Sequence, residues 1–311
     1  MSIVSNPAPL AVCSGHHEIV WAVAFHRAPD GRPLLATTGW DGSVRLWDPA
    51  TGSCLWAAEF PSPALSVFSV AMDGGLLATG SADGRTSVWD LATGDQLYAT
   101  SGEPPVLSVA WGAGLLATGG ADCHVRFKDR ATGAVLRELT GHTGPVWSLA
   151  FAGDTLLASG GADATVRVWD VPGGECRREL TGHRFTVQSV ACHTLPDGTV
   201  LLASGSADTT GRVWNVSTGE LLHTITRHTG WLRTVAFTTL PDGTTLLATT
   251  SDDHTAVVWR VDTMTEVAVF EHPSGVNGVA FGSLEDGRPI LATGCTDRQA
   301  YVWSLWRRQY R

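Results

Sequence analysis

The sequence predicts an all-β fold made of seven four-stranded sheets. The first observation is a repeat, because a short apolar run that ends in tryptophan, and in one unit in lysine, recurs every 39 to 45 residues along the 311-residue chain. The second is that each unit contains runs of about five residues set between Gly, Asp and Pro, which is typical of strands joined by tight turns. The third is that no helical period extends beyond a single turn. The positions equivalent to that tryptophan are Trp47, Trp89, Lys128, Trp169, Trp214, Trp259 and Trp303.

The predicted strands follow in the same order in each unit, and the fourth unit shows them most clearly. Its first strand is VWSLAF (146–151), its second lies in LLASGGAD (156–163), and its third lies in ATVRVWD (164–170). A fourth run, ECRREL (175–180), follows after a short turn. Turn sequences such as PDG and ATG supply the positive φ angles that tight hairpins require.

Seven such sheets are expected to close into a ring. An isolated four-stranded sheet has two open edges, whereas sheets repeated around an axis bury both faces against their neighbours. We therefore predict a seven-bladed β-propeller with four antiparallel strands per blade, forming a single domain over residues 1–311. Residues 8–16 (APLAVCSGH) align with the end of a unit at 134–142, while the seventh unit reaches Trp303 after only three strands. We expect residues 9–13 to be the outer strand of the last blade, so that the N-terminal strand closes the ring, and residues 304–311 to form a tail or a covering segment.

The repeated motifs resemble those of the WD-repeat family of β-propellers. That family shows a Gly-His pair, a strand, an Asp in a tight turn and a Trp-Asp pair, and GHTGPVWSLAF…LLASGGADATVRVWD (141–170) matches nearly all of this pattern. The resemblance extends over residues 9–304 in seven units. It implies a scaffold fold, and it implies that the His face of the propeller surrounds the mouth of a central channel.

The resemblance also implies a hydrogen-bond chain in each blade that joins His, Ser or Thr, Asp and Trp. The histidines are His16, His142, His183, His228 and His272; the aspartates are Asp41, Asp163, Asp208, Asp253 and Asp297; the tryptophans are Trp47, Trp169, Trp214 and Trp259. Units two and three have Pro63 and Gly102 at the His position. His, Ser and Asp together also occur in hydrolases, but a catalytic nucleophile is needed once and this set is repeated. We expect the set to be structural, because buried polar groups must be paired.

The third unit departs most from the pattern, because Lys128 stands where the others have Trp. This unit lacks the His as well, so Asp122 loses two of the partners implied by the resemblance. We expect Lys128 to supply a charge partner for Asp122, and we expect units two and three to be the least stable part of the ring. No motif supports the alternative of a Schiff-base or acyl-accepting lysine.

Composition excludes several classes of function. The net charge of −9 disfavours a nucleic-acid partner, which requires a basic surface. The six cysteines form no CxxC pair and the histidines are scattered, so we expect no metal and no other cofactor. No apolar run approaches the ~20 residues of a membrane-spanning helix, and the N-terminus is a poor signal peptide. We expect a reduced cytoplasmic protein without a membrane partner, present as a monomer.

Candidate binding residues occupy positions at which the seven units disagree. One such position follows the first Val of each opening strand, another precedes that Val, and a third precedes the turn Asp. Large or charged residues at these positions are Trp21, Trp40, Phe68, Leu107, Trp147, Trp231, Arg233 and Asp252. Aromatic residues and Arg are typical anchors of protein interfaces. The alternative is that most of these aromatic side chains are buried between loops.

We therefore expect a non-catalytic scaffold that binds a protein or peptide on the aromatic face around the channel mouth. The alternative is a sensor or regulatory propeller of a bacterial signalling system associated with an ATPase or kinase. An enzyme that uses the channel mouth is a third possibility, less favoured than either. The acidic turns of the opposite face, such as the one holding Asp242, are expected to be solvated loops.

Overall fold

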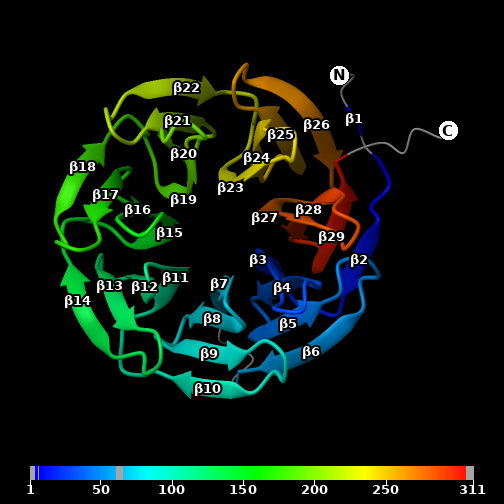
Figure 1. Cartoon of the computed structure of the whole chain (residues 1–311), viewed down its shortest axis with the longest axis horizontal. Coiled ribbons are helices and arrows are strands. Elements are labelled where there is room, and N and C mark those ends of the chain that lie inside the picture. Colours follow the sequence, from blue (N-terminus) through cyan, green and yellow to red (C-terminus); the bar gives the residue numbers. More distant parts are fainter. Residues whose placement is uncertain (1–3, 6, 61–65, 306–311) are drawn as a thin grey trace.

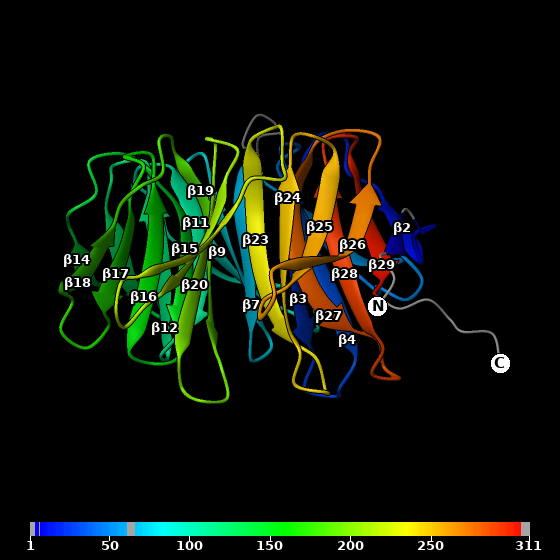
Figure 2. The same cartoon turned by 90° about the horizontal axis from the view of Figure 1, so that it is seen from above.

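The computed structural model describes residues 4–5, 7–60 and 66–305, and every regular element in these ranges is a β-strand. The strands form seven sheets arranged around one axis (Figure 1). This arrangement confirms the predicted all-β, seven-bladed propeller. Seen from the side, the strands run between two faces of the ring that carry the connecting loops (Figure 2).

Each blade begins with the strand nearest the axis and continues outward. Blade 1 holds β3 (Val20–Arg27), β4 (Pro33–Gly39), β5 (Ser43–Trp47) and β6 (Cys54–Glu59). Blade 2 holds β7 (Val67–Asp73), β8 (Leu76–Ser81), β9 (Thr86–Asp90) and β10 (Gln96–Ala99). Blade 3 holds β11 (Val106–Gly112), β12 (Leu115–Gly120), β13 (Val125–Asp129) and β14 (Val135–Leu139). Blade 4 holds β15 (Val146–Ala152), β16 (Leu156–Gly161), β17 (Val166–Asp170) and β18 (Cys176–Leu180).

The later blades have longer inner hairpins. Blade 5 holds β19 (Val187–Thr194), β20 (Val200–Ser206), β21 (Gly211–Asn215) and β22 (Leu221–Ile225). Blade 6 holds β23 (Leu232–Thr239), β24 (Thr245–Ser251), β25 (Thr255–Arg260) and β26 (Thr265–Glu271). Blade 7 holds β27 (Val276–Ser283), β28 (Pro289–Cys295) and β29 (Gln299–Ser304), together with β2 (Ala11–Ser14).

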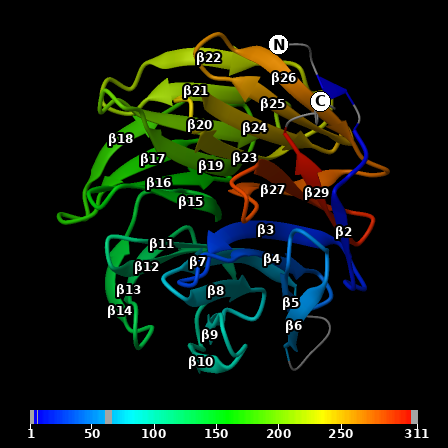
Figure 3. The same ribbon diagram turned by 45° about the vertical axis from the view of Figure 1, so that its right-hand side comes forward.

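The N-terminal segment contributes to two blades. β2 pairs antiparallel with β29, with Ala11 opposite Val302 and Cys13 opposite Ala300, and it forms the outer strand of blade 7 (Figure 3). The side chains of Ala11 and Cys13 are buried in the core between blades 7 and 1. A short strand, β1 (Val4–Ser5), pairs parallel with β26. Blade 6 therefore has a fifth strand, which differs from the uniform four-strand prediction.

The apolar core lies between neighbouring sheets. One cluster joins Leu34 and Leu46 of blade 1 to Leu77 and Trp89 of blade 2, and similar clusters lie between other neighbouring blades. The second strand is the most buried, as shown by β4, in which all seven residues are buried. A strand that is covered on both faces reads as a continuous apolar run rather than an alternating one, which explains the LLAT and LLAS blocks.

The tight turn after each second strand is fixed by its Asp. Asp163 Oδ1 accepts a hydrogen bond from the backbone N–H of Thr165 at 3.1 Å, and the residue between them, Ala164, has φ of 63°. The same left-handed position is held by Gly42, Gly84, Cys123, Ala164, Thr209, His254 and Arg298. Five of the seven are not glycine, although this conformation costs an L-residue free energy. The Asp side chain therefore stabilises a turn that the following residue disfavours.

Candidate functional site

A β-bulge occurs at the same place in the innermost strand of every blade. The pairing of β3 with β4 skips from Val20 to Ala22, and the pairing of β15 with β16 skips from Val146 to Ser148. The bulged residues are Trp21, Phe68, Leu107, Trp147, Gln188, Arg233 and Asn277. A bulge bends its strand and redirects one side chain. These seven residues line a cavity of about 200 Å³ at the axis, which is the channel mouth.

Hydroxyl groups next to the bulges hold neighbouring blades in register. Ser69 Oγ of blade 2 accepts the backbone N–H of Val109 in blade 3 at 3.0 Å. Ser148 Oγ of blade 4 accepts the N–H of Val190 in blade 5 at 2.9 Å. Each bond lies one residue beyond a bulged side chain, so these bonds fix where the channel-lining side chains stand relative to one another.

Aromatic side chains form a connected row on this face. The rings of Trp40 and Trp21 stack with centroids 5.4 Å apart. Phe68 meets Trp21 edge to face at 6.2 Å and meets Trp147 at 6.5 Å. Ring pairs with this geometry contribute more stabilisation than their buried apolar area alone provides. The four rings are therefore held in fixed positions relative to one another.

A charged residue extends the row towards blade 6. The Arg233 guanidinium donates from Nε to Asp252 Oδ1 at 2.7 Å and from Nη2 to Oδ2 at 2.8 Å. Its Cζ atom lies 4.9 Å from the ring centroid of Trp231 and 5.7 Å from that of Trp21. Arg233 therefore bridges two indoles while its charge is balanced by one carboxylate.

The predicted binding residues differ in exposure. Trp231 and Trp40 are exposed, at 50% and 41% of their surface, and Trp21, Phe68, Trp147, Arg233 and Asp252 are partly buried. Leu107 is only 6% exposed, so it lines the cavity but offers little surface for contact. Phe185, which the sequence reasoning missed, is 62% exposed in the loop before β19. Phe185 lies one residue before Thr186, the residue of blade 5 at the variable position that precedes the first Val. A comparison of the seven units at the position before that one would have identified it.

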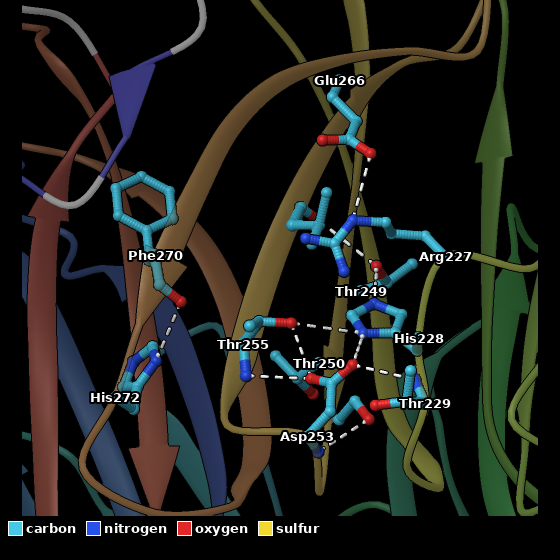
Figure 4. Close-up of polar contacts among 12 residues, drawn as sticks. Arg227, His228, Thr229, Thr249, Thr250, Asp253, Thr255, Glu266, Phe270 and His272 are labelled. Carbon is cyan, nitrogen blue, oxygen red and sulfur yellow. Dashed lines mark hydrogen bonds and ion pairs between the residues drawn. The ribbon is translucent and has the colours of Figure 1, made fainter.

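The expected polar contacts are present in blades 1, 4, 5 and 6. In blade 4, His142 Nδ1 lies 2.9 Å from Asp163 Oδ2, His142 Nε2 lies 2.7 Å from Ser159 Oγ, and Trp169 Nε1 donates to Ser159 Oγ at 2.8 Å. Figure 4 shows the set of blade 6, where His228 lies between Thr249 and Asp253. The corresponding sets are His16, Thr37, Asp41 and Trp47 in blade 1, and His183, Ser204, Asp208 and Trp214 in blade 5; Trp259 completes that of blade 6.

The environment of these sets is that of a structural network. Burial lowers the pKa of His142 although Asp163 opposes the shift, so the ring is neutral, with Nδ1–H donating to the carboxylate. Burial also disfavours the ionised form of Asp163, but hydrogen bonds from Thr143 and His142 outweigh it and lower the pKa of that carboxyl. Ser159 is completely buried, and its oxygen is occupied by His142 and Trp169. A substrate has no access to that hydroxyl.

The predicted contact between His272 and Asp297 in blade 7 is wrong. His272 Nδ1 instead faces the carbonyl oxygen of Phe270 at 3.2 Å (Figure 4). Its Nε2 lies 2.8 Å from Thr293 Oγ1. The phenol of Tyr301 donates to Asp297 Oδ2 at 2.5 Å. Tyr301 therefore occupies the carboxylate that blades 1, 4, 5 and 6 leave to His. Burial lowers the pKa of His272 to about 4.

The predicted partner of Lys128 is also wrong. Its Nζ donates to both Glu103 oxygens at 2.8 Å and to Thr86 Oγ1 at 2.9 Å, and the lysine is completely buried. Burial lowers the pKa of Lys128, and the Glu103 carboxylate partly offsets this shift. Asp122 is paired with Arg126 and with His124. Blade 3 thus replaces the buried His and Trp with a Glu and Lys pair.

Some predicted features lie outside the part of the chain that the structure describes, namely Pro63 and the tail at 306–311. Within the described part, no group of three or more His, Cys, Asp or Glu side chains has a metal-binding arrangement. Within the same ranges, no helix is long and apolar enough to cross a membrane.

Comparison with known proteins identifies the family of the fold and shows which part of the chain differs from the family pattern. The family described as "WD domain, G-beta repeat" matches residues 7–48, 57–90, 133–170, 174–215, 219–260 and 264–304. The unmatched stretch between the second and third matches holds β11, β12 and β13, where Lys128 and Glu103 replace the usual residues. The chain is also similar to the Eukaryotic translation initiation factor 3 subunit I of Scheffersomyces stipitis, with 36% identity over 63 residues. That alignment covers 20% of this chain and 17% of the other protein. The six matches extend over most of this chain, which therefore belongs to the WD-repeat family of β-propellers.

Proposed function

We propose that this propeller is a non-catalytic scaffold that binds a protein or peptide on the face around its channel mouth. The observation that carries the proposal is the conjunction of the seven bulges with the residues found there. The bulges direct the variable side chains towards the mouth, and aromatic rings occupy three of these seven positions. Trp40 and Trp231 add exposed indoles beside them.

The energetics favour an interface at this face. An exposed indole keeps a large apolar area in water, and burying it against a partner recovers that free energy. Trp and Arg are the residues that most often dominate binding energy at interfaces. The binding set is Trp21, Trp40, Phe68, Trp147, Trp231, Arg233 and Asp252, with Phe185 added and Leu107 in a supporting position.

We propose further that the chain is a cytoplasmic monomer, that its partner is a protein rather than a nucleic acid or a membrane, and that residues 1–311 act as one domain. The net charge of −9 supports the exclusion of nucleic acid. The similar protein named above is, by its name, a subunit of a larger factor, which agrees with a role in protein assembly. No observation favours the alternative of a sensor linked to an ATPase or kinase.

Affinity capture with variants tests the proposal. The wild-type chain, Trp231→Ala and Asp242→Ala serve as bait, and captured proteins are quantified by mass spectrometry. Asp242 lies in an exposed turn of the opposite face and is the matched control. A partner on the proposed face loses about 2 kcal/mol or more of binding free energy with Trp231→Ala and is unaffected by Asp242→Ala. The reverse pattern, with both variants folded by circular dichroism, would place the partner on the other face.

A further inference from the structure

A second pocket lies between blades 1 and 2, at the end of the inner strands away from the channel mouth, with a volume of about 540 Å³. It arises because two neighbouring hairpins differ in length. The inner hairpin of blade 1 has the long loop 28–32, whereas that of blade 2 turns within residues 74–75. The long loop extends past the short one, and its residues Ala28, Pro29 and Arg32 form one wall of the space that remains.

The interior of this pocket is apolar and preformed. Leu34, Leu46 and Leu91 form its buried floor, and Trp56 forms a side wall. The Nε1–H of Trp56 donates to the carbonyl oxygen of Leu91 at 3.1 Å, and its ring packs against Gly94, where an added Cβ would lie 3.1 Å from it. Pockets that hold small organic molecules have volumes of about 300–1,000 Å³ and a mainly apolar and aromatic lining. The pocket between blades 1 and 2 fits this description.

The polar groups at the rim carry one negative charge in excess. Arg32 donates from Nε to Asp30 Oδ2 at 2.6 Å, so these two charges offset each other. Asp90 Oδ1 accepts the backbone N–H groups of Ala92 and Thr93, both at 2.9 Å. Within the described part of the chain, Asp90 Oδ2 accepts no hydrogen bond and Asp90 forms no ion pair. A ligand with one cationic group beside an apolar body would complement this rim.

We propose that this pocket binds a small aromatic amine, with the ring of the ligand on Trp56 and its ammonium group donating to Asp90 Oδ2. Burial of the ring against the apolar floor supplies most of the binding free energy, and the aromatic wall favours a ring over an alkyl chain. The ion pair with the carboxylate selects for positive charge. The pocket is separate from the channel mouth, so the proposal does not depend on the proposed function.

A related pocket between blades 4 and 5 shows which features matter. It also lies where a short hairpin loop (153–155) adjoins a long one (195–199), and its volume is about 440 Å³. Arg178 lines it at the position that Trp56 holds in blade 1. Asn215 stands at the end of the third strand of blade 5, where blade 2 has Asp90. This pocket lacks both the aromatic wall and the free carboxylate, so we do not expect it to bind the amine.

Ligand-observed NMR titrations of the full chain with three probes of similar shape test the proposal. Phenethylamine, phenethyl alcohol and phenylacetate share a phenyl ring and differ in charge. At neutral pH and physiological salt, we expect the amine to bind about fivefold more tightly than the alcohol, which is the effect of one partly exposed ion pair, and the acid to bind most weakly. Asp90→Asn is expected to remove the preference for the amine and to leave the affinity for the alcohol unchanged. The variant should keep the turn, because Asn215 Oδ1 accepts the N–H groups of Ser217 and Thr218 in the equivalent turn of blade 5.

Two control variants locate the site. Asp48→Asn makes the same change of net charge at the same turn position of blade 1, and Asp48 does not line the pocket. Trp147→Ala removes an aromatic ring from the channel mouth. Both variants are expected to bind the amine within twofold of wild type. The proposal fails if the wild type does not bind the amine at millimolar concentration, if the alcohol binds as tightly as the amine, or if either control weakens the amine as much as Asp90→Asn does.

Discussion

Neutralising Glu103 is expected to destabilise the propeller through the lysine it faces. Glu103→Gln keeps the shape of the side chain but leaves the ammonium of Lys128 buried without a counter-charge, 2.8 Å from an amide. Breaking one side of a buried ion pair costs about 3–5 kcal/mol. The cost has an upper bound, because the amine can release its proton instead. Deprotonating a lysine of pKa ~10.4 at pH 7 costs about 4.6 kcal/mol.

The side chain of Glu103 is 16% exposed, so water already screens the pair slightly. We therefore expect a loss near the lower limit, about 3 kcal/mol, in the free energy of unfolding measured by urea denaturation at pH 7. If the lysine has become neutral in the variant, the loss falls as the pH rises towards 8.5, by at most about 1.4 kcal/mol per pH unit.

A double variant is the matched control. Lys128→Met with Glu103→Gln removes both charges, and replacing a whole buried pair with neutral groups of similar volume is often neutral or stabilising. Thr86 loses one hydrogen bond, at about 1 kcal/mol. We expect the double variant to unfold within about 1 kcal/mol of wild type. A single variant that loses under about 0.5 kcal/mol, or a double variant as unstable as the single one, would refute the reasoning.

Three other predictions concern the framework. The pKa of His272 is lowered to about 4, so its neutral form stabilises the fold above pH ~6.5 and this contribution, about 3 kcal/mol, is lost as the pH falls towards 4. The variant His272→Gln should therefore show a flatter dependence of the urea unfolding free energy on pH between about 6.5 and 4. Parallel pH profiles for the variant and the wild type would contradict this. Asp163→Ala should lower the free energy of unfolding by roughly 1–3 kcal/mol. Asp122→Ala should lower it less, because Arg126 keeps Glu138 as a second partner. Equal shifts of the denaturant midpoint in the two variants would argue against a structural network. Deleting residues 1–13 removes β2 from the edge of β29, so calorimetry and light scattering should show a lower melting temperature and aggregation; an equally stable, monomeric variant would show that the strand is dispensable.

The blades could be predicted from the sequence because their framework residues repeat. Asp163 and Trp169 have counterparts at fixed offsets in most units, and each repeat reports the same turn and the same buried strand. The two-residue β1 could not be predicted, because so short a parallel strand has no periodic pattern. The direction of the Trp21 side chain could not be predicted from the alternation of side chains along a strand either. A bulge shifts that alternation by one residue.

The two wrong predictions at the polar sites have a common cause. In each, a residue that the comparison of the repeats does not place there makes the contact expected of an aligned residue. Gly102 occupies the His position of unit three in the sequence, but Glu103 is the residue that reaches Lys128. In blade 7, the phenol of Tyr301 takes the carboxylate expected to bind His272. Neither contact is visible from spacing alone, because both depend on how far a side chain extends. The binding role of the mouth residues stays a prediction.

The burial of Lys128 has a consequence for the chemistry of the whole surface. It is the only lysine in the sequence, and its amine is enclosed by Glu103 and Thr86. The folded chain therefore presents no lysine amine to acylating reagents, to ubiquitin-type conjugation or to amine-reactive labels. Apart from histidine, every basic side chain on the surface is therefore an arginine. Arginine does not undergo these reactions. Acylation of Lys128 would consequently report opening of blade 3 rather than surface accessibility, which makes this residue a built-in probe of local unfolding.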